Sequence, residues 1–234
     1  MASVKRRAGK RRVGAVVFDC DGVLLVSNRL KAAVFREALA EKGFHPQDIA
    51  RFSRYQTSNF GISRYRLFED FLAWPDLVVR PQADRDALVA AYARLLRGRY
   101  TRCATTPGMR EVLDGLAARG LPLFVVSGSD GNELREVFAE RGLAGRFRAI
   151  HGSPASKAEN LRLVAAELGR ELPLEDVWFI GDAEADLVAA EAVGARFAYA
   201  DHFSTAKPRM RQLATERGFP VIRDLRGLPA LLDA

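Results

Sequence analysis

The chain has 234 residues, of which 48% are hydrophobic, and its formal net charge is +7, so it is long enough to bury a sizeable core in one or two domains. No run approaches the roughly 18 apolar residues of a membrane span, and no apolar segment with a cleavage site follows the basic N-terminus, so we expect neither a membrane protein nor a signal peptide. Two cysteines are too few for a disulfide scaffold, which favours a cytoplasmic location.

Most of the net positive charge lies in residues 1–12, which hold six basic residues and no acidic one. The rest of the chain is therefore close to neutral. We interpret residues 1–12 as a disordered basic tail outside the folded body. Such a tail can make weak contacts with nucleic acid, although a solvated leader is the simpler interpretation, and no other nucleic-acid partner is expected.

The first predicted element is a buried parallel strand over residues 13–18, an apolar run that leads directly into Asp19, Cys20, Asp21 and Gly22. Because side chains alternate along a strand, Asp19 and Asp21 point the same way and Cys20 points toward the core. Two carboxylates this close disfavour each other's ionisation unless a cation lies between them. The pair therefore indicates a divalent metal, a phosphoryl group, or both.

Residues 28–102 contain no convincing strand. Their apolar residues recur at helical spacing, with breaks predicted near residues 43–46, 58–61 and 74–81. We predict a helical insertion between the first strand and the rest of the sheet.

Strands and helices alternate after residue 103. Thr106 is the expected N-cap of a helix with Pro107 in its first turn, and Asp130 with Glu133 is spaced as a capping box. The predicted strands are 121–127, 147–151, 177–181 and 195–200, and the predicted helices after them are 130–142, 156–169 and 185–193. This alternation predicts a parallel sheet, that is, a Rossmann-like three-layer α/β core over residues 13–27 and 103–234 with the cap of residues 28–102 inserted.

The ends of these strands carry polar residues, where ligands bind in such sheets. Ser127 and Gly128 end the second strand, and Asp182 ends the fourth, with Asp186 four residues later. Lys157 is predicted as the first residue of its helix, where a cation opposes the helix dipole. That position is favourable if the ammonium group faces an anion.

These segments, in this order, resemble the motifs of the haloacid dehalogenase superfamily of phosphotransferases. The match runs from residue 13 to about residue 200. The helical insertion is similar to the cap of the phosphoglycolate phosphatase and β-phosphoglucomutase branch. Val26 stands where many members of that branch have an aspartate.

The resemblance implies a role for each motif residue. Asp19 is the nucleophile that forms an aspartyl-phosphate, and Asp21 is the general acid and then the general base. Ser127, the backbone of Gly128 and Lys157 bind the phosphoryl oxygens.

The same resemblance implies an oxygen-liganded Mg²⁺ site. The carboxylates of Asp19 and Asp182 and the carbonyl of Asp21 are the expected ligands. Asp186 acts as an outer or water-mediated ligand, unless it only stabilises the first turn of its helix.

In the cap, Arg64 is a candidate for binding an anionic or polyol group of the substrate, and Ser63 lies beside it. The alternative is that Ser63 caps a helix while Arg64 lies in solvent. Arg29 and Lys31 could face the cleft, although such residues on a helix more often lie in solvent.

We therefore expect an Mg²⁺-dependent phosphatase acting on a small phosphorylated metabolite such as a sugar phosphate or a phosphoglycolate-like compound. A sugar phosphomutase would use the same motifs and is the main alternative. A non-catalytic binding protein on a phosphatase scaffold is a further one, but none of the catalytic aspartates is missing.

Overall fold

The computed structural model describes residues 13–169 and 173–234, so the interpretation of residues 1–12 as a tail lies outside it. A parallel sheet of six strands, in the order β3-β2-β1-β4-β5-β6, forms the centre of the described chain. The strands are β1 (Ala15–Phe18), β2 (Leu123–Asp130), β3 (Ala149–Ser153), β4 (Val177–Gly181), β5 (Arg196–Ala200) and β6 (Val221–Ile222).

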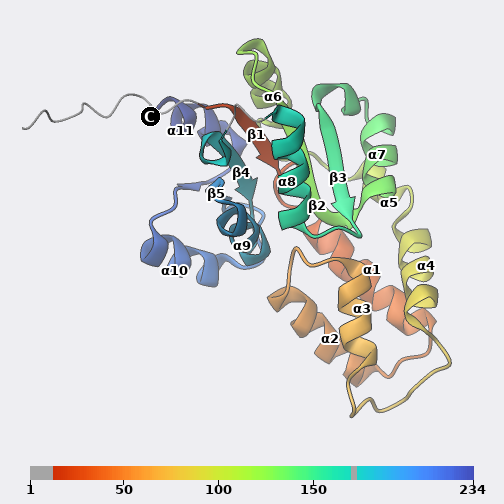
Figure 1. Cartoon of the computed structure of the whole chain (residues 1–234). Helices are drawn as coiled ribbons and strands as arrows, with labels where there is room; N and C mark the ends of the chain where they lie inside the picture. Colours follow the sequence, from red (N-terminus) through yellow and green to blue (C-terminus); the bar gives the residue numbers. More distant parts are fainter. Residues whose placement is uncertain (1–12, 170–172) are drawn as a thin grey trace, which may run out of the picture.

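Two helical groups accompany the sheet (Figure 1). The first, which we call the inserted helices, comprises α1 (Asn28–Glu41), α2 (Pro46–Ser58), α3 (Arg64–Leu72), α4 (Arg85–Leu96) and α5 (Arg99–Arg102). The second comprises α6 (Met109–Ala118), α7 (Gly131–Glu140), α8 (Lys157–Leu168), α9 (Glu184–Val193), α10 (Lys207–Arg217) and α11 (Leu228–Asp233).

Alternate residues of each central strand enter two separate hydrophobic cores. Val16 and Phe18 of β1 pack on the face covered by α6, α7 and α11. Ala15 and Val17 pack on the opposite face, against α8, α9 and α10. Both faces are covered, which explains why the strands read as continuous apolar runs. This arrangement confirms the predicted three-layer α/β fold.

The inserted helices have an aromatic core of their own that is continuous with one face of the sheet. Phe35 lies at its centre, with ring centroids 5.6 Å from Phe52, 5.2 Å from Phe68 and 4.4 Å from Tyr92. In Figure 1 the arrowhead of β3 points toward this helical group. The inserted helices thus lie near the carboxyl ends of the strands, where the polar motif residues were predicted.

The N-cap predicted at Thr106 is wrong. Helix α6 begins at Met109, and its N-cap is Gly108 with a φ of 76°, in the left-handed region that favours glycine. The Thr106 hydroxyl instead donates to the carbonyl oxygen of Val23 at 2.6 Å. Thr106 therefore fastens the segment after the inserted helices to the loop that follows β1.

Elements after residue 200 were not predicted. Helix α10 is rich in charged residues and buries only Met210 and Leu213, while β6 has two residues. Such short or weakly apolar elements give little periodic signal. Among the described residues, none of the helices combines the length and the apolar character that crossing a bilayer requires.

We predict that Thr106→Val lowers the free energy of unfolding by about 1–2 kcal/mol, because a buried carbonyl loses its donor while the side-chain shape is kept. Thr106→Ser, which retains the hydroxyl, is the control and is expected to lose less. Urea denaturation measures both. Equal stability of Thr106→Val and the unmodified protein would contradict the structural role of this hydrogen bond.

Candidate active site

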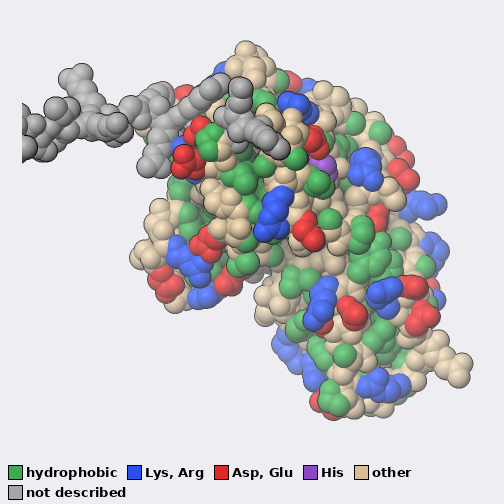
Figure 2. Space-filling model, viewed as in Figure 1, with side chains coloured by type: hydrophobic (Ala, Val, Ile, Leu, Met, Phe, Trp, Pro, Cys, Tyr) green, Lys and Arg blue, Asp and Glu red, His purple; other side chains and the backbone are tan. Residues whose placement is uncertain are grey.

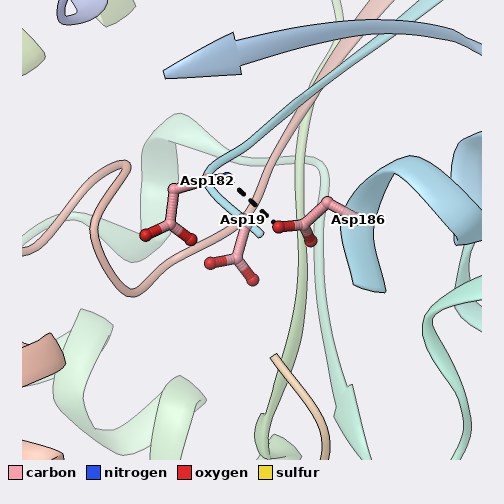
Figure 3. Close-up of side chains that lie close together, drawn as sticks. All are labelled: Asp19, Asp182 and Asp186. Atoms are coloured by element: carbon pink, nitrogen blue, oxygen red, sulfur yellow. Dashed lines mark hydrogen bonds between the residues drawn. The ribbon is translucent and has the colours of Figure 1, made fainter. Parts of the chain in front are cut away.

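Three carboxylates converge where the neighbouring strands β1 and β4 end. Asp19 follows β1, Asp182 follows β4, and Asp186 lies in the first turn of α9. Each offers an oxygen within 4.8 Å of the others, and all three residues are buried. Figure 3 shows the carboxylates of Asp19 and Asp186 on one side of Asp182, all directed toward a common region.

Asp186 holds the loop that carries Asp182. One of its oxygens accepts a hydrogen bond from the backbone N–H of Asp182 at 3.1 Å (Figure 3) and a second one from the backbone N–H of Ala183 at 3.0 Å. The side chain lies so close to Gly181 that a Cβ at that glycine would collide with it. The sequence GDxxxD therefore builds a closed turn in which Asp186 fixes the direction of Asp182.

Lys157 is the cation of this cluster. Ser156 and Glu159 form the predicted capping box, which places Lys157 at the start of α8. Its ammonium nitrogen lies 2.9 Å from an oxygen of Asp19 and 2.5 Å from an oxygen of Asp186. Burial lowers the pKa of Lys157, but the two carboxylates raise it more, so the group stays charged.

The donor set fits a divalent cation. Three carboxylates and one ammonium leave a formal charge of −2 in a buried, all-oxygen site. Burial raises the pKa of Asp19 to about 7, against the opposing effect of Lys157. Burial, together with Asp19 and Asp186, raises the pKa of Asp182 well above its usual range. A cation such as Mg²⁺ removes this repulsion with ligands of the kind it prefers.

Asp21 lies in a different environment, although only one residue separates it from Asp19. One oxygen accepts from Ser27 at 2.5 Å and Tyr100 at 2.9 Å, and the other accepts from Ser129 at 2.8 Å and from Lys31 at 2.5 Å. Burial raises the pKa of Asp21, but Lys31 and the hydroxyl donors outweigh this effect and lower it below its ordinary value. Its side chain is thus held as a carboxylate by the protein itself.

Ser127 and Gly128 lie beside Asp19, as the sequence predicted. Asp19, Ser127 and Gly128 line one small cavity. Ser127 is buried, and its oxygen accepts a hydrogen bond from the backbone N–H of Ser129 at 3.2 Å. A Cβ at Gly128 would collide with the carbonyl oxygen of Gly61, so glycine is required for this close approach of the inserted helices.

Arg64 and Ser63 line different spaces, Arg64 an inner cavity and Ser63 an outer groove. Arg64 is buried, lines the small cavity, forms an ion pair with Glu133 of α7 and lies 4.5 Å from the ring centroid of Tyr92. Ser63 caps α3 by accepting from the N–H of Arg66 at 3.3 Å. The alternative in which Arg64 lies in solvent is therefore wrong, and the capping position of Ser63 is confirmed.

Two spaces meet at the active site. An inner cavity of about 40 Å³ contains Asp19 and Asp21, and an outer groove of about 910 Å³ runs between the α2–α3 loop and helices α8, α9 and α10. Figure 2 shows the outer indentation between α10 and the inserted helices. Phe60, Gly61 and Ile62 line both spaces, so this segment separates the catalytic cavity from the groove.

Sequence reasoning missed several residues of the site. For Lys31 the solvated position was favoured over one facing the cleft, but the residue is buried, because it reaches Asp21 and Ser129. Asn28 donates to Asp182 at 2.7 Å, and Gln56 lines the inner cavity. Lys31 and Gln56 lie on helices where a polar residue normally indicates solvent, and only the tertiary contacts place them in the site. Arg29 is exposed, as expected.

Comparison with known proteins agrees with this geometry. The model of the haloacid dehalogenase-like hydrolase family matches residues 13–194, and the chain belongs to this family. A phosphoglycolate phosphatase of Cereibacter sphaeroides is 29% identical over 198 residues, covering 78% of this chain and 83% of that protein.

Solved structures share the fold. A protein described as a predicted phosphatase from Clostridium acetobutylicum has a TM-score of 0.75 at 16% identity and covers 95% of this chain and 100% of its own. A CbbY variant from Rhodobacter sphaeroides, solved with xylulose-(1,5)bisphosphate, has a TM-score of 0.68 at 20% identity and covers 91% of this chain and 95% of its own. The resemblance seen in the sequence motifs is thereby confirmed at the level of family and fold.

The raised pKa values of Asp19 and Asp182 predict a pH-dependent effect of metal on stability. Both side chains bind protons more tightly in the folded protein than in the unfolded chain. Without metal, the free energy of unfolding is therefore expected to decrease as the pH rises from about 4 to above 7. A bound cation replaces those protons. At a hundredfold excess over its Kd, Mg²⁺ is expected to add about 2.7 kcal/mol, or about 5–10 °C in Tm, at pH 8 and much less at pH 5.

Thermal unfolding with Mg²⁺ or with a chelator at the two pH values measures this difference. Asp182→Asn is the matched variant. It is expected to lose most of the Mg²⁺ increment at pH 8 and to be no less stable than the unmodified protein in chelator. An equal Mg²⁺ increment in both proteins would show that the three carboxylates do not hold the cation.

Proposed function

We propose that this hydrolase is an Mg²⁺-dependent phosphatase that cleaves a small phosphomonoester through an aspartyl-phosphate on Asp19. The observation that carries the proposal is the setting of the Asp19 carboxylate. It lies 2.9 Å from the ammonium of Lys157, within 4.8 Å of two further carboxylates, and in one cavity with Ser127 and Gly128. Phosphoryl transfer needs this combination of a positioned nucleophile and positive charge on the phosphoryl oxygens.

In the first step, an oxygen of Asp19 attacks phosphorus and the bond to the leaving oxygen breaks. The ammonium of Lys157 and the donors at Ser127 and Gly128 stabilise the charge on the non-bridging oxygens. The ammonium group of Lys157 is held in position because it donates hydrogen bonds to both Asp19 and Asp186. The step therefore depends on side chains that are already fixed before the substrate arrives.

Asp21 would protonate the leaving oxygen and afterwards take a proton from the water that attacks the aspartyl-phosphate. In the substrate-free site Asp21 is held as a carboxylate, which suits the second role. The negative charge of a bound phosphoryl group raises the pKa of a neighbouring acid, which favours the protonated form needed for the first role.

Asp19 and Asp182 would hold the metal with their carboxylates, and Asp21 would hold it with its backbone carbonyl. Asp186 would keep Asp182 in place through its hydrogen bonds to the backbone of that loop. When bound, Mg²⁺ supplies positive charge that keeps Asp19 ionised and offsets the charge of the phosphoryl group. The chemistry of the donor set, in which all ligands are oxygens, supports this ion.

We also propose that residues 28–102 act as a cap on a core of residues 13–27 and 103–234. The close approach of Gly61 to Gly128 supports a cap that seals the cavity and excludes bulk water. The enclosed volume, the name of the C. sphaeroides relative and the ligand of the CbbY variant all favour a small phosphorylated metabolite as the substrate. Two free cysteines are consistent with a cytoplasmic location.

We predict that Asp19→Asn abolishes phosphate release from small phosphomonoesters and removes the covalent phosphoryl adduct, because an amide oxygen is a far weaker nucleophile. Phosphate release and intact-protein mass after acid quench measure the two effects. Asp114→Asn, at an exposed aspartate, is the control and should retain activity. Undiminished turnover in Asp19→Asn would overturn the mechanism, and formation of an isomer without phosphate release would favour a phosphomutase.

Asp21→Asn is expected to impair alkyl phosphates more than aryl phosphates. An alkoxide needs a proton to leave, whereas a nitrophenolate does not, so the loss in kcat/KM should be about 10²–10⁴-fold for the first and much smaller for the second. Steady-state kinetics on ethyl phosphate and para-nitrophenyl phosphate give this ratio. An equal loss on both substrates would mean that Asp21 is not the general acid.

A further inference from the structure

The carboxylate of Asp182 is oriented by a residue of the inserted helices. Its oxygen Oδ2 accepts a hydrogen bond at 2.7 Å from Nδ2 of Asn28, the first residue of α1. Both residues are buried, with 4% of Asn28 and 2% of Asp182 exposed. Within residues 13–169 and 173–234, no other side chain donates a hydrogen bond to this carboxylate. A single amide on α1 therefore orients a carboxylate that lies after β4.

The other hydrogen bonds of Asp182 hold its backbone. Asp186 accepts from its N–H at 3.1 Å, and the hydroxyl of Ser204 donates to its carbonyl oxygen at 2.6 Å. These contacts fix where the residue lies but not how its side chain is turned. Outer residues that bind a metal ligand control the direction of that ligand and thereby the affinity for the metal. Asn28 is the residue in a position to do so for Asp182.

The amide of Asn28 keeps this orientation with one polar atom unpaired. Its second N–H donates at 3.1 Å to the carbonyl oxygen of Phe203, in the loop after β5, while its oxygen Oδ1 is buried and has no donor in the part of the chain that the structure describes. A buried acceptor without a donor lowers stability. An apolar side chain would avoid this loss, so the presence of an amide here indicates a contact that serves function.

The loop after β1 leaves room for this contact. A Cβ at Gly22 would lie 2.2 Å from the Asp182 oxygen Oδ2 and 2.5 Å from Nδ2 of Asn28. Gly22 also has a φ of 82°, in the region that favours glycine. Both its backbone conformation and the absence of a side chain therefore allow the amide and the carboxylate to meet.

Resting on the cation site of the proposed function, we propose that Asn28 is a positioning residue for Asp182 that couples cation binding to the docking of α1. The amide holds the carboxylate in the direction that receives the cation, and a bound cation fixes the carboxylate to which Asn28 donates. Such coupling is reciprocal. If loss of the Asn28 contact weakens Mg²⁺ binding about tenfold, saturating Mg²⁺ stabilises the docked start of α1 by the same factor.

A purely structural role of Asn28 makes a different prediction. In that case the amide only fastens the start of α1 to the loops after β4 and β5. Its removal then lowers the stability of the protein and leaves the affinity for Mg²⁺ unchanged. The dissociation constant of Mg²⁺, measured on folded protein, separates the two roles.

The first test measures Mg²⁺ binding by isothermal titration calorimetry at pH 8 without substrate. Asn28→Leu removes the amide and keeps a branched side chain of similar shape, and we expect it to raise the Kd of Mg²⁺ about 10–100-fold. Asn132→Leu is the matched control, because it makes the same change at an exposed asparagine in the first turn of α7. The control should keep the Kd within about twofold.

The second test uses hydrogen exchange on the unmodified protein and needs no variant to fold. The amide of Lys31 donates to the carbonyl oxygen of Ser27 at 2.9 Å, so it exchanges when the first turn of α1 opens. Saturating Mg²⁺ is expected to slow exchange at residues 31–34 by about tenfold relative to chelator. Helix α6, which packs on β2 and α11, is the reference and should be slowed less. In Asn28→Leu the additional protection of α1 should disappear.

The role of Asn28 is overturned if Asn28→Leu binds Mg²⁺ with the Kd of the unmodified protein, or if Mg²⁺ slows exchange in α1 no more than in α6. An unmodified protein that binds no Mg²⁺ would overturn both the cation site and the role of Asn28. Binding of Mg²⁺ that depends on Asn28, in a protein that hydrolyses no phosphomonoester, would contradict the phosphatase proposal alone.

Discussion

Repulsion among three buried carboxylates is the constraint on which the rest of this site depends. Asp19, Asp182 and Asp186 come within 4.8 Å of one another at the edge of the sheet, and Lys157 neutralises only part of their charge. Such a cluster persists only when the surrounding structure fixes each member. The backbone N–H groups that bind Asp186 and the amide of Asn28 that binds Asp182 provide this support.

The fold brings these residues together by strand order. β1 lies between β2 and β4, so Asp19 after β1, Ser127 in the second half of β2 and Asp182 after β4 meet at one edge although they are far apart in the chain. The inserted helices then close over this edge, and Gly61 approaches Gly128 so closely that no side chain fits between them. The position of Lys157 at the start of α8 follows from its capping box, which directs its ammonium group into the same region.

Much of this arrangement could be predicted from the sequence, and the reason is physical. The apolar strands and the residues at their ends are local features, so Asp19, Ser127 and Asp182 were found from patterns of a few residues. Lys31 and Gln56 lie on helices of the insertion, and their burial depends on contacts with segments distant in sequence. Local periodicity carries no information on such contacts, which is why they became apparent only in the structure.

The two acids of the DCDG segment illustrate how one short sequence supports two chemical roles. The pKa of Asp21 is lowered, against its burial, by Lys31 and hydroxyl groups that belong to the protein, whereas burial raises the pKa of Asp19 to about 7 despite Lys157. A nucleophile must be ionised, so Asp19 needs positive charge beyond that of Lys157, whereas Asp21 does not. Dependence on a divalent cation would thus arise at the nucleophile and not at the neighbouring acid.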